Sequence, residues 1–352
     1  MLDLHKKDFR DPKIFWYAPK KYWVMAVVLS VELITQFYSS KNLKDWNLLS
    51  EFGPIGDTSG VWECPDLTQV PIDGMPGKKK WLLQTSQNSS MQYFVGEFDG
   101  VKFINESSTE KIYRPDYGPD YYAAIAYGQL PSTHLPTAIG WLNNWNYAND
   151  IPTTPWKGAM SIPRTLSVKK INARPDDPVG RGEWILIQKP VEKIKTLRQL
   201  VYSTKNRIIE KYIQLPPDLK QGEMEVVIQA NDSSVAGVRL AVDGHDHYFE
   251  IGYDTRKKVL YIDRSKMANQ AFNKKFSTLN RFETSYTFSG NKIKLRIFFD
   301  NSIAEVFAND GERVFTAQIF PGEYDDSGIE VFSDNVYSRL VSCSVYKIKT
   351  VW

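Results

Sequence analysis

Short apolar segments dominate the chain, and they indicate a protein built from β-strands. Most of them are about four to eight residues long, rich in Val, Ile, Tyr, Phe and Trp, and bounded by Gly, Pro, Asn or Asp. Residues 80–85 and 183–187 are examples. Helical periodicity is scarce, and β-branched and aromatic side chains favour strands. The pattern therefore predicts an all-β fold.

An apolar run at residues 24–29 is predicted to form a buried strand. The run is too short to span a bilayer, and Glu32 follows it closely. No secretory signal peptide is visible in the chain. We therefore expect no membrane segment.

Two stretches of the first half share one plan. Residues 37–46 and 93–103 each consist of a strand, a polar turn and a closing aromatic residue, Trp46 in one and Phe103 in the other. The spacing of the two aromatics suits a four-stranded propeller blade with long loops. Residues 1–190 are therefore predicted to form a partial β-propeller.

The composition changes near residue 190, and shorter, more regularly alternating segments follow. About seven antiparallel strands in such a stretch are typical of a β-sandwich, and Asn309-Asp310-Gly311 marks a hairpin between two of them. We predict a linker at 191–200 and a β-sandwich at 201–352. Its expected strands are 223–229, 238–242, 247–253, 258–263, 292–300, 303–307 and 329–334.

Charge and cysteine content exclude several classes of function. The net charge is +3, with 44 basic and 41 acidic residues, so no global field attracts nucleic acid or an acidic membrane. Cys64 and Cys343 are the only cysteines and lie far apart, which argues against a disulfide framework. The four histidines lack the spacing of zinc ligands. No metal and no cofactor are expected.

Glu63 is the first candidate for chemistry. Trp62 can shield this carboxyl group from water, and Pro65 stiffens the backbone that follows. A shielded carboxyl holds its proton more readily, as a general acid must in order to protonate a leaving-group oxygen. The alternative is a glutamate at the end of a strand that accepts a hydrogen bond from a backbone amide.

Asp11 is the second candidate, in the motif Phe9-Arg10-Asp11-Pro12. Arg10 can hold Asp11 ionised or grip a ligand hydroxyl. A charged aspartate can accept hydrogen bonds from sugar hydroxyls, and two carboxylates flanking a sugar ring are the basic equipment of a glycosidase. The alternative is a structural Arg–Asp pair in a turn.

Two later regions carry residues that suit a binding site. Residues 113–124 form a bent, Pro- and Gly-containing segment whose acids Asp116 and Asp120 fit the rim of a binding loop, although two carboxylates alone make a poor calcium site. Residues 140–160 combine amides with tryptophans such as Trp145. Amides reach sugar hydroxyls and indoles cover ring CH groups. A packed propeller corner would use tryptophans as well.

Taken together, these motifs resemble glycoside hydrolase family 32, the β-fructofuranosidases, and within it the levanase and exo-inulinase branch. The resemblance extends over practically the whole chain. It rests on Arg10-Asp11-Pro12, Glu63-Cys64-Pro65, the segments 117–123 and 140–164, and the sandwich segments 262–266 and 299–307.

The resemblance implies a five-bladed propeller followed by a β-sandwich, and retaining hydrolysis of terminal β-D-fructofuranosyl residues in fructans or sucrose. It makes Glu63 the general acid and then the general base, and Asp11 the transition-state stabiliser. The remaining residues expected to bind substrate are Arg10, Trp62, Asp120 and Trp145. The family's action on external fructans implies a periplasmic or secreted protein.

One family feature is missing from the sequence. The nucleophile of the family is an aspartate in an Asn-Asp-Pro-Asn-like motif, and residues 1–352 hold no such motif. We expect about three of the five blades, and Asp11 is not expected to replace the nucleophile because the resemblance gives it another role. A fragment of a fructan hydrolase and a non-catalytic fructan-binding remnant both remain open, as do the preferred fructan and the oligomeric state.

Overall fold

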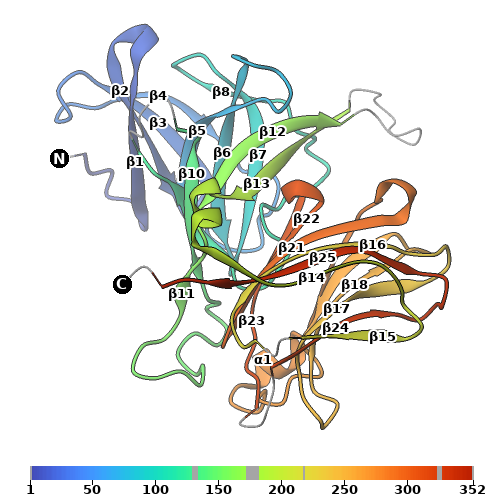
Figure 1. Cartoon of the computed structure of the whole chain (residues 1–352). Coiled ribbons are helices and arrows are strands. Elements are labelled where there is room, and N and C mark those ends of the chain that lie inside the picture. Colours follow the sequence, from blue (N-terminus) through green and yellow to red (C-terminus); the bar gives the residue numbers. More distant parts are fainter. Residues whose placement is uncertain (1, 129–133, 172–181, 217–218, 323–326, 351–352) are drawn as a thin grey trace. The chain divides into compact units, whose positions relative to one another are not determined.

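The computed structural model describes residues 2–128, 134–171, 182–216, 219–322 and 327–350. Its elements are almost all strands (Figure 1). The chain divides into two compact units. The first contains residues 1–115, 121–141 and 162–189, and the second contains residues 116–120, 142–161 and 190–352. The all-β prediction is confirmed.

The first unit contains three antiparallel sheets of the propeller-blade type, in which consecutive strands are neighbours. The first sheet consists of β1 (Phe9–Tyr17), β2 (Tyr22–Leu29), β3 (Ile34–Ser40) and β4 (Asn47–Phe52). The second consists of β5 (Glu63–Pro71), β6 (Lys79–Gln87), β7 (Ser90–Phe98) and β8 (Phe103–Asn105). The third includes β9 (Tyr122–Ala126), β10 (Thr137–Leu142), β12 (Arg164–Ile171) and β13 (Glu183–Pro190).

The middle sheet is apolar on both faces, because it lies between the other two. Leu83 and Phe94 pack against the first sheet, in one hydrophobic cluster with Phe37. Leu82 and Val95, one residue along each strand, belong to the cluster shared with the third sheet. Side chains alternate between the faces of a strand, so a sheet covered on both sides requires continuous apolar runs. The run at 24–29 forms the buried part of β2 as predicted. Val24 and Ala26 belong to the cluster shared with the middle sheet, and Met25 and Val27 to a separate cluster, so β2 is covered on both faces too.

The second unit is a sandwich of two six-stranded sheets. One sheet has the order β14 (Arg198–Ile208), β25 (Arg339–Ile348), β16 (Gly222–Gln229), β21 (Lys292–Asp300), β22 (Ile303–Ala308) and β23 (Arg313–Gln318). The other has the order β15 (Tyr212–Leu215), β24 (Gly328–Ser333), β17 (Val235–Val242), β18 (Phe249–Asp254), β19 (Val259–Asp263) and β20 (Arg281–Ser285). Their facing apolar side chains form one core.

The sandwich prediction is confirmed, but its count of about seven strands was too low. All seven expected strands are present, and the predicted hairpin joins β22 to β23. Among the strands that were not predicted, β15 and β20 are short edge strands: β15 has only four residues, and no residue of β20 is buried. The stretch 191–200 holds a 3₁₀ helix (Glu192–Leu197) and the start of β14.

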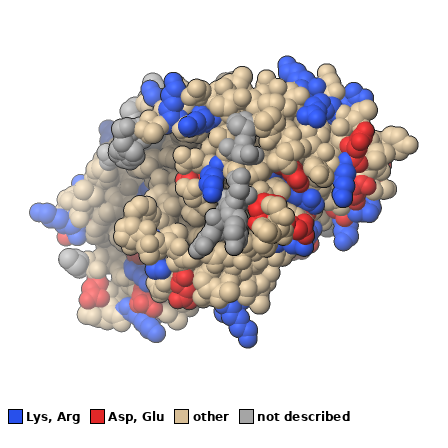
Figure 2. Space-filling model, turned by 60° about the horizontal axis from the view of Figure 1, so that its bottom comes forward, with Lys and Arg blue, Asp and Glu red and all other residues tan. Residues whose placement is uncertain are grey.

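The remaining elements are short. They are the two-residue strand β11 (Ala159–Met160), which is hydrogen-bonded to β10, the α-helix α1 (Lys274–Thr278) and three further 3₁₀ turns (Ala18–Lys20, Ser289–Asn291 and Asn309–Gly311). Among the described residues, no helix has the length and hydrophobicity needed to cross a membrane. Figure 2 shows acidic and basic side chains scattered over the face in view, among many uncharged ones.

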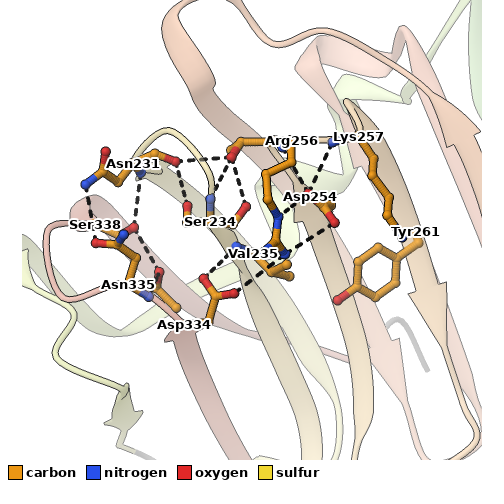
Figure 3. A network of polar contacts seen from close by, with 12 residues as sticks. Asn231, Ser234, Val235, Asp254, Arg256, Lys257, Tyr261, Asp334, Asn335 and Ser338 are labelled. Carbon is orange, nitrogen blue, oxygen red and sulfur yellow. Dashed lines mark hydrogen bonds and ion pairs between the residues drawn. The ribbon is translucent and has the colours of Figure 1, made fainter.

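A polar network joins three turns of the sandwich (Figure 3). The Asp334 carboxylate accepts a hydrogen bond from the Val235 amide at 2.7 Å, and the Ser234 hydroxyl donates to the Asn231 carbonyl at 2.6 Å. Asp254 accepts hydrogen bonds from the amide and the guanidinium group of Arg256. These bonds satisfy the backbone of the turns, which gives the network a structural role.

Candidate active site

Two β-bulges place the candidate carboxylates on neighbouring sheets. The pairing of β1 with β2 shifts register between Arg10 and Lys13, and the pairing of β5 with β6 shifts between Glu63 and Asp66. Each bulge contains a proline, which has no N–H group to donate to the ladder. Bulges redirect side chains and are common beside active sites. The two sequence motifs are therefore two copies of one structural device.

Backbone conformation marks the same positions. Asp11 has φ 61° and Cys64 has φ 48°, both in the left-handed region that non-glycine residues seldom adopt. The first strand of the third sheet repeats the feature at Ala123, with φ 50°. The first strands of all three sheets thus bend at one residue each.

Glu63 is held by residues from the other two sheets. The Arg10 Nη2 group donates to Glu63 Oε1 at 2.5 Å, and the Tyr122 hydroxyl donates to Glu63 Oε2. Arg10 is held in turn by the Ser30 hydroxyl, which accepts from its Nε at 3.2 Å. The Glu63 side chain keeps 22% of its surface exposed, so a ligand can still reach it.

Asp11 is tied to the second bulge through the backbone. Its Oδ2 accepts a hydrogen bond from the Cys64 amide at 2.9 Å and lies 4.0 Å from Arg10 Nε. The Asp11 side chain is 33% exposed. Burial, together with the nearby charges of Asp11 and Glu63, raises the pKa of the Cys64 thiol to about 12. The thiol is therefore protonated at neutral pH and is a poor nucleophile.

A buried ion pair lies next to the bulges. Asp66 is fully buried, and its carboxylate lies 3.4 Å from Lys13 Nζ and accepts a hydrogen bond from the Ala126 amide at 2.6 Å. The Lys13 ammonium group also donates to the Ala126 carbonyl. These three residues belong to β1, β5 and β9, so the pair fastens together the three strands that carry the site.

Trp62 does not take the role predicted for it. Its ring is fully buried, packs near Phe94 and donates a hydrogen bond from Nε1 to the Asp57 carbonyl at 3.0 Å. A side chain without exposed surface cannot stack on a sugar. The predicted contact of Trp62 with substrate is therefore replaced by a packing role beneath the Glu63 bulge.

Asp120 is also a structural residue rather than part of a binding rim. It is fully buried, forms an ion pair with Arg264 Nη1 at 3.2 Å, and accepts hydrogen bonds from the Tyr147 hydroxyl and the Gln318 amide. With both oxygens engaged, it has none to offer a sugar. The nearby Asp116 accepts hydrogen bonds from the amide and hydroxyl of Thr316.

Trp145 belongs to the second unit and has 63% of its surface exposed. Its contact with a sugar stays a prediction. Among the described residues, no group of three or more His, Cys, Asp or Glu side chains is arranged to hold a metal ion.

Two residues of this site were missed by sequence reasoning. Tyr122 lies within the motif segment 117–123 but has no predicted role, and Lys13 directly follows the Arg10-Asp11-Pro12 motif without belonging to it. Tyr122 contacts a residue 59 positions away, and Lys13 contacts one 53 positions away, in different sheets. A single sequence carries no signal for such pairings beyond the tyrosine's place in the motif 117–123.

Comparison with known proteins assigns the chain to a family. The N-terminal domain profile of glycosyl hydrolases family 32 matches residues 2–175, and the C-terminal profile matches residues 193–347. Over 99% of its length the chain is 39% identical to a levanase of Bacillus subtilis, of which it spans 51%. It is 33% identical to an extracellular exo-inulinase of Aspergillus awamori, of which it spans 66%. The chain thus spans about half to two thirds of the length of these relatives.

Solved structures agree with the sequence relatives. The crystal structure of the Aspergillus awamori exo-inulinase matches 98% of the chain with a TM-score of 0.87 and 31% identity, and 68% of that structure is covered. A β-fructofuranosidase of Schwanniomyces occidentalis, solved with fructosyl-erythritol, matches 99% of the chain with a TM-score of 0.85 and 26% identity, and 72% of it is covered. Domain profiles, sequence relatives and fold all lead to one assignment: the chain belongs to glycosyl hydrolase family 32.

Proposed function

We propose that the chain acts in the hydrolysis of terminal β-D-fructofuranosyl residues of fructans or sucrose. The observation that carries this proposal is the meeting of Glu63, Asp11 and Arg10 at two adjoining bulges, with both carboxylates partly exposed. Support comes from the relatives, whose names are levanase and exo-inulinase. We take the chemistry to be retaining because the family resemblance implies it, since a pair of carboxylates is common to retaining and inverting glycosidases.

Glu63 acts as general acid and then as general base. In the first step its proton passes to the glycosidic oxygen while the bond from that oxygen to the anomeric carbon breaks. Arg10 and Tyr122 then stabilise the carboxylate that remains, because both donate hydrogen bonds to it. In the second step the carboxylate takes a proton from the attacking water.

Asp11 binds the fructosyl ring and stabilises its developing positive charge. Oδ2 is occupied by the Cys64 amide, whereas Oδ1 has no hydrogen-bond partner among the described residues. A sugar hydroxyl can donate to this oxygen. Arg10, with its side chain 40% exposed, is the second proposed contact of the sugar. Trp145 is a third, since an exposed indole can stack on sugar CH groups.

The nucleophile is not assigned to any residue of the chain. Retention requires a second carboxylate about 5–5.5 Å from the acid, on the opposite face of the sugar. Residues 1–352 contain no Asn-Asp-Pro-Asn-like motif. We therefore assign the acid/base and the stabilising aspartate to this chain, and we assign the attacking carboxylate to none of its residues.

Two further proposals accompany the function. The protein acts outside the cytoplasm, as two relatives named extracellular exo-inulinases do. The propeller-type domain is residues 1–190, the linker is 191–200 and the sandwich is 201–352.

The test uses the full chain with sucrose, inulin and levan, and measures free fructose over time. Glu63→Gln should abolish release, because an amide N–H is far too weak an acid to protonate the leaving-group oxygen. Glu97→Gln is the matched control, since Glu97 is an exposed glutamate of β7. Sugar binding without release of fructose would contradict hydrolysis and support a fructan-binding remnant. Equal release by Glu63→Gln and the control would remove Glu63 from the mechanism.

A further inference from the structure

The two oxygens of Glu63 have chemically different partners. Oε1 faces Arg10, whose guanidinium group can only donate hydrogen bonds. Oε2 faces the hydroxyl of Tyr122, which can donate or accept. A proton on Oε1 would point toward an N–H group, whereas a proton on Oε2 can be accepted by the tyrosine oxygen.

We propose that Tyr122 is the positioning residue that makes Oε2 the proton-carrying oxygen of Glu63, a role that rests on the proposed function. While Glu63 is charged, the tyrosine hydroxyl donates to Oε2. When Oε2 carries a proton and no substrate is bound, the same hydroxyl turns and accepts it. When substrate arrives, the proton on Oε2 passes to the glycosidic oxygen and the tyrosine donates again. The carboxyl group need not move between these states.

The surroundings of Tyr122 hold its hydroxyl in place. The side chain is only 4% exposed, and its ring meets Trp141 edge to face with centroids 6.3 Å apart. Trp141 is also its cross-strand partner in β10. The pKa of Tyr122 is raised, first by burial and then by the Glu63 carboxylate, so the hydroxyl keeps its proton.

A second contact fixes β9 against the strand pair that carries Glu63. Ser86 is the cross-strand partner of Glu63 in β6, and its hydroxyl accepts a hydrogen bond from the Ala123 amide at 3.1 Å. Ala123 directly follows Tyr122 and has the left-handed backbone of a bulge. Glu63, Ser86, Ala123 and Tyr122 therefore form a closed ring of contacts. Such contacts fix the Tyr122 hydroxyl in one position, as a residue that orients the proton of Glu63 requires.

The test compares two substrates that differ in their need for an acid. The leaving group of sucrose is glucose, a weakly acidic alcohol whose departure depends on protonation. The leaving group of 4-nitrophenyl β-D-fructofuranoside is 4-nitrophenolate, which is stable without a proton. For Tyr122→Phe we expect kcat/KM on sucrose to fall by on the order of 10- to 100-fold, with kcat/KM on the aryl fructoside nearly unchanged. Tyr38→Phe is the matched control, since it removes another buried tyrosine hydroxyl, one that donates to Gln36.

Equal losses on both substrates would show a structural role and overturn the proposal, as would unchanged kinetics on sucrose. A second measurement does not depend on turnover. The hydroxyl proton of Tyr122, followed by NMR in a chain with labelled tyrosine, should be visible and should shift upfield in Glu63→Gln, because an amide oxygen is a weaker acceptor than a carboxylate. If the wild-type chain hydrolyses neither substrate, the proposed function fails, while a missing or unshifted hydroxyl signal overturns the contact itself.

Discussion

The Cys64 amide donates a hydrogen bond to Asp11 Oδ2 at 2.9 Å, and this bond joins the two bulges of the site. Both residues have left-handed backbone conformations. Such conformations cost of order 1–3 kcal/mol and persist where neighbouring contacts impose them. The Asp11 carboxylate is such a contact. The position of Asp11 therefore depends on Cys64 and the Glu63 bulge, so the two motifs hold each other in place.

The reactivity of the Cys64 thiol should depend on the charge of Asp11. Burial, Asp11 and Glu63 raise its pKa to about 12, so little thiolate exists at pH 8.5 and alkylation by iodoacetamide should be slow. Asp11→Asn removes one of the negative charges, which lowers the pKa and should speed alkylation several-fold. Mass spectrometry of the modified peptide gives the rate.

Cys343 serves as the internal control for that measurement. Its pKa is raised to about 12 by burial alone, so the same substitution should leave its alkylation rate unchanged. A rate at Cys64 that stays the same in Asp11→Asn would show that the carboxylate does not act on the thiol.

The Lys13–Asp66 pair should be essential for the stability of the first unit. Asp66→Asn leaves the Lys13 ammonium group, whose side chain is 15% exposed, without its partner charge. Breaking a buried pair costs about 3–5 kcal/mol, and partial exposure of Lys13 places this case near the lower end. Urea unfolding followed by tryptophan fluorescence measures the loss. The exposed Asp73, replaced by Asn, should change stability by less than about 0.5 kcal/mol. Similar losses in both variants would refute the role of the pair.

The fold class could be predicted from the sequence because the first domain shows short apolar runs bounded by turn residues and the second shows more regular alternation. The strand predicted at 292–300 matches β21, whose apolar residues alternate and then run together where both faces are covered. The edge strands β15 and β20 could not be found this way. Their partners within the sheet, not their own composition, make them strands.

Only those site residues that lie in a recognisable sequence motif could be predicted. Glu63 and Asp11 were found because each lies in a short, recognisable motif. Trp62 precedes Glu63 in the same motif yet is fully buried. The sequence around it does not indicate in which direction its side chain points. The contacts of Tyr122 with Glu63, and of Asp120 with Arg264, join residues far apart in sequence. Such contacts are set by packing, which one sequence does not reveal.

Asp57 should make stability depend on acid pH. Burial opposes its ionisation, but hydrogen bonds from Ser59 and from Arg114 outweigh burial, so its pKa lies below its usual value. A lowered pKa in the folded state gives stability that is present above the unfolded pKa of about 3.9 and is lost as the pH falls through the folded value. The destabilisation by Asp57→Asn should therefore be largest near pH 7 and should shrink below about pH 4.

Urea unfolding at several pH values checks this dependence. Asp45→Asn provides the control, since that carboxylate is exposed. A loss of stability in Asp57→Asn that is the same at pH 7 and pH 3 would mean that the charge of Asp57 contributes nothing.

Gly140 should tolerate no side chain, because it packs against the tyrosine next to Tyr122. A Cβ added at this position would lie 2.6 Å from Tyr121 Cε2, and the Tyr121 ring is held in turn by the Arg164 guanidinium group, 4.0 Å from its centroid. Overpacking of this kind costs about 1–3 kcal/mol. Gly140→Ala should lower the midpoint of thermal unfolding and, by displacing β9, should also lower kcat/KM on sucrose. Gly128→Ala is the matched control, since no atom of the described residues lies within 4 Å of its added Cβ. Equal midpoints in the two variants would show that the ring moves aside freely and that β9 is not held as tightly as its contacts indicate.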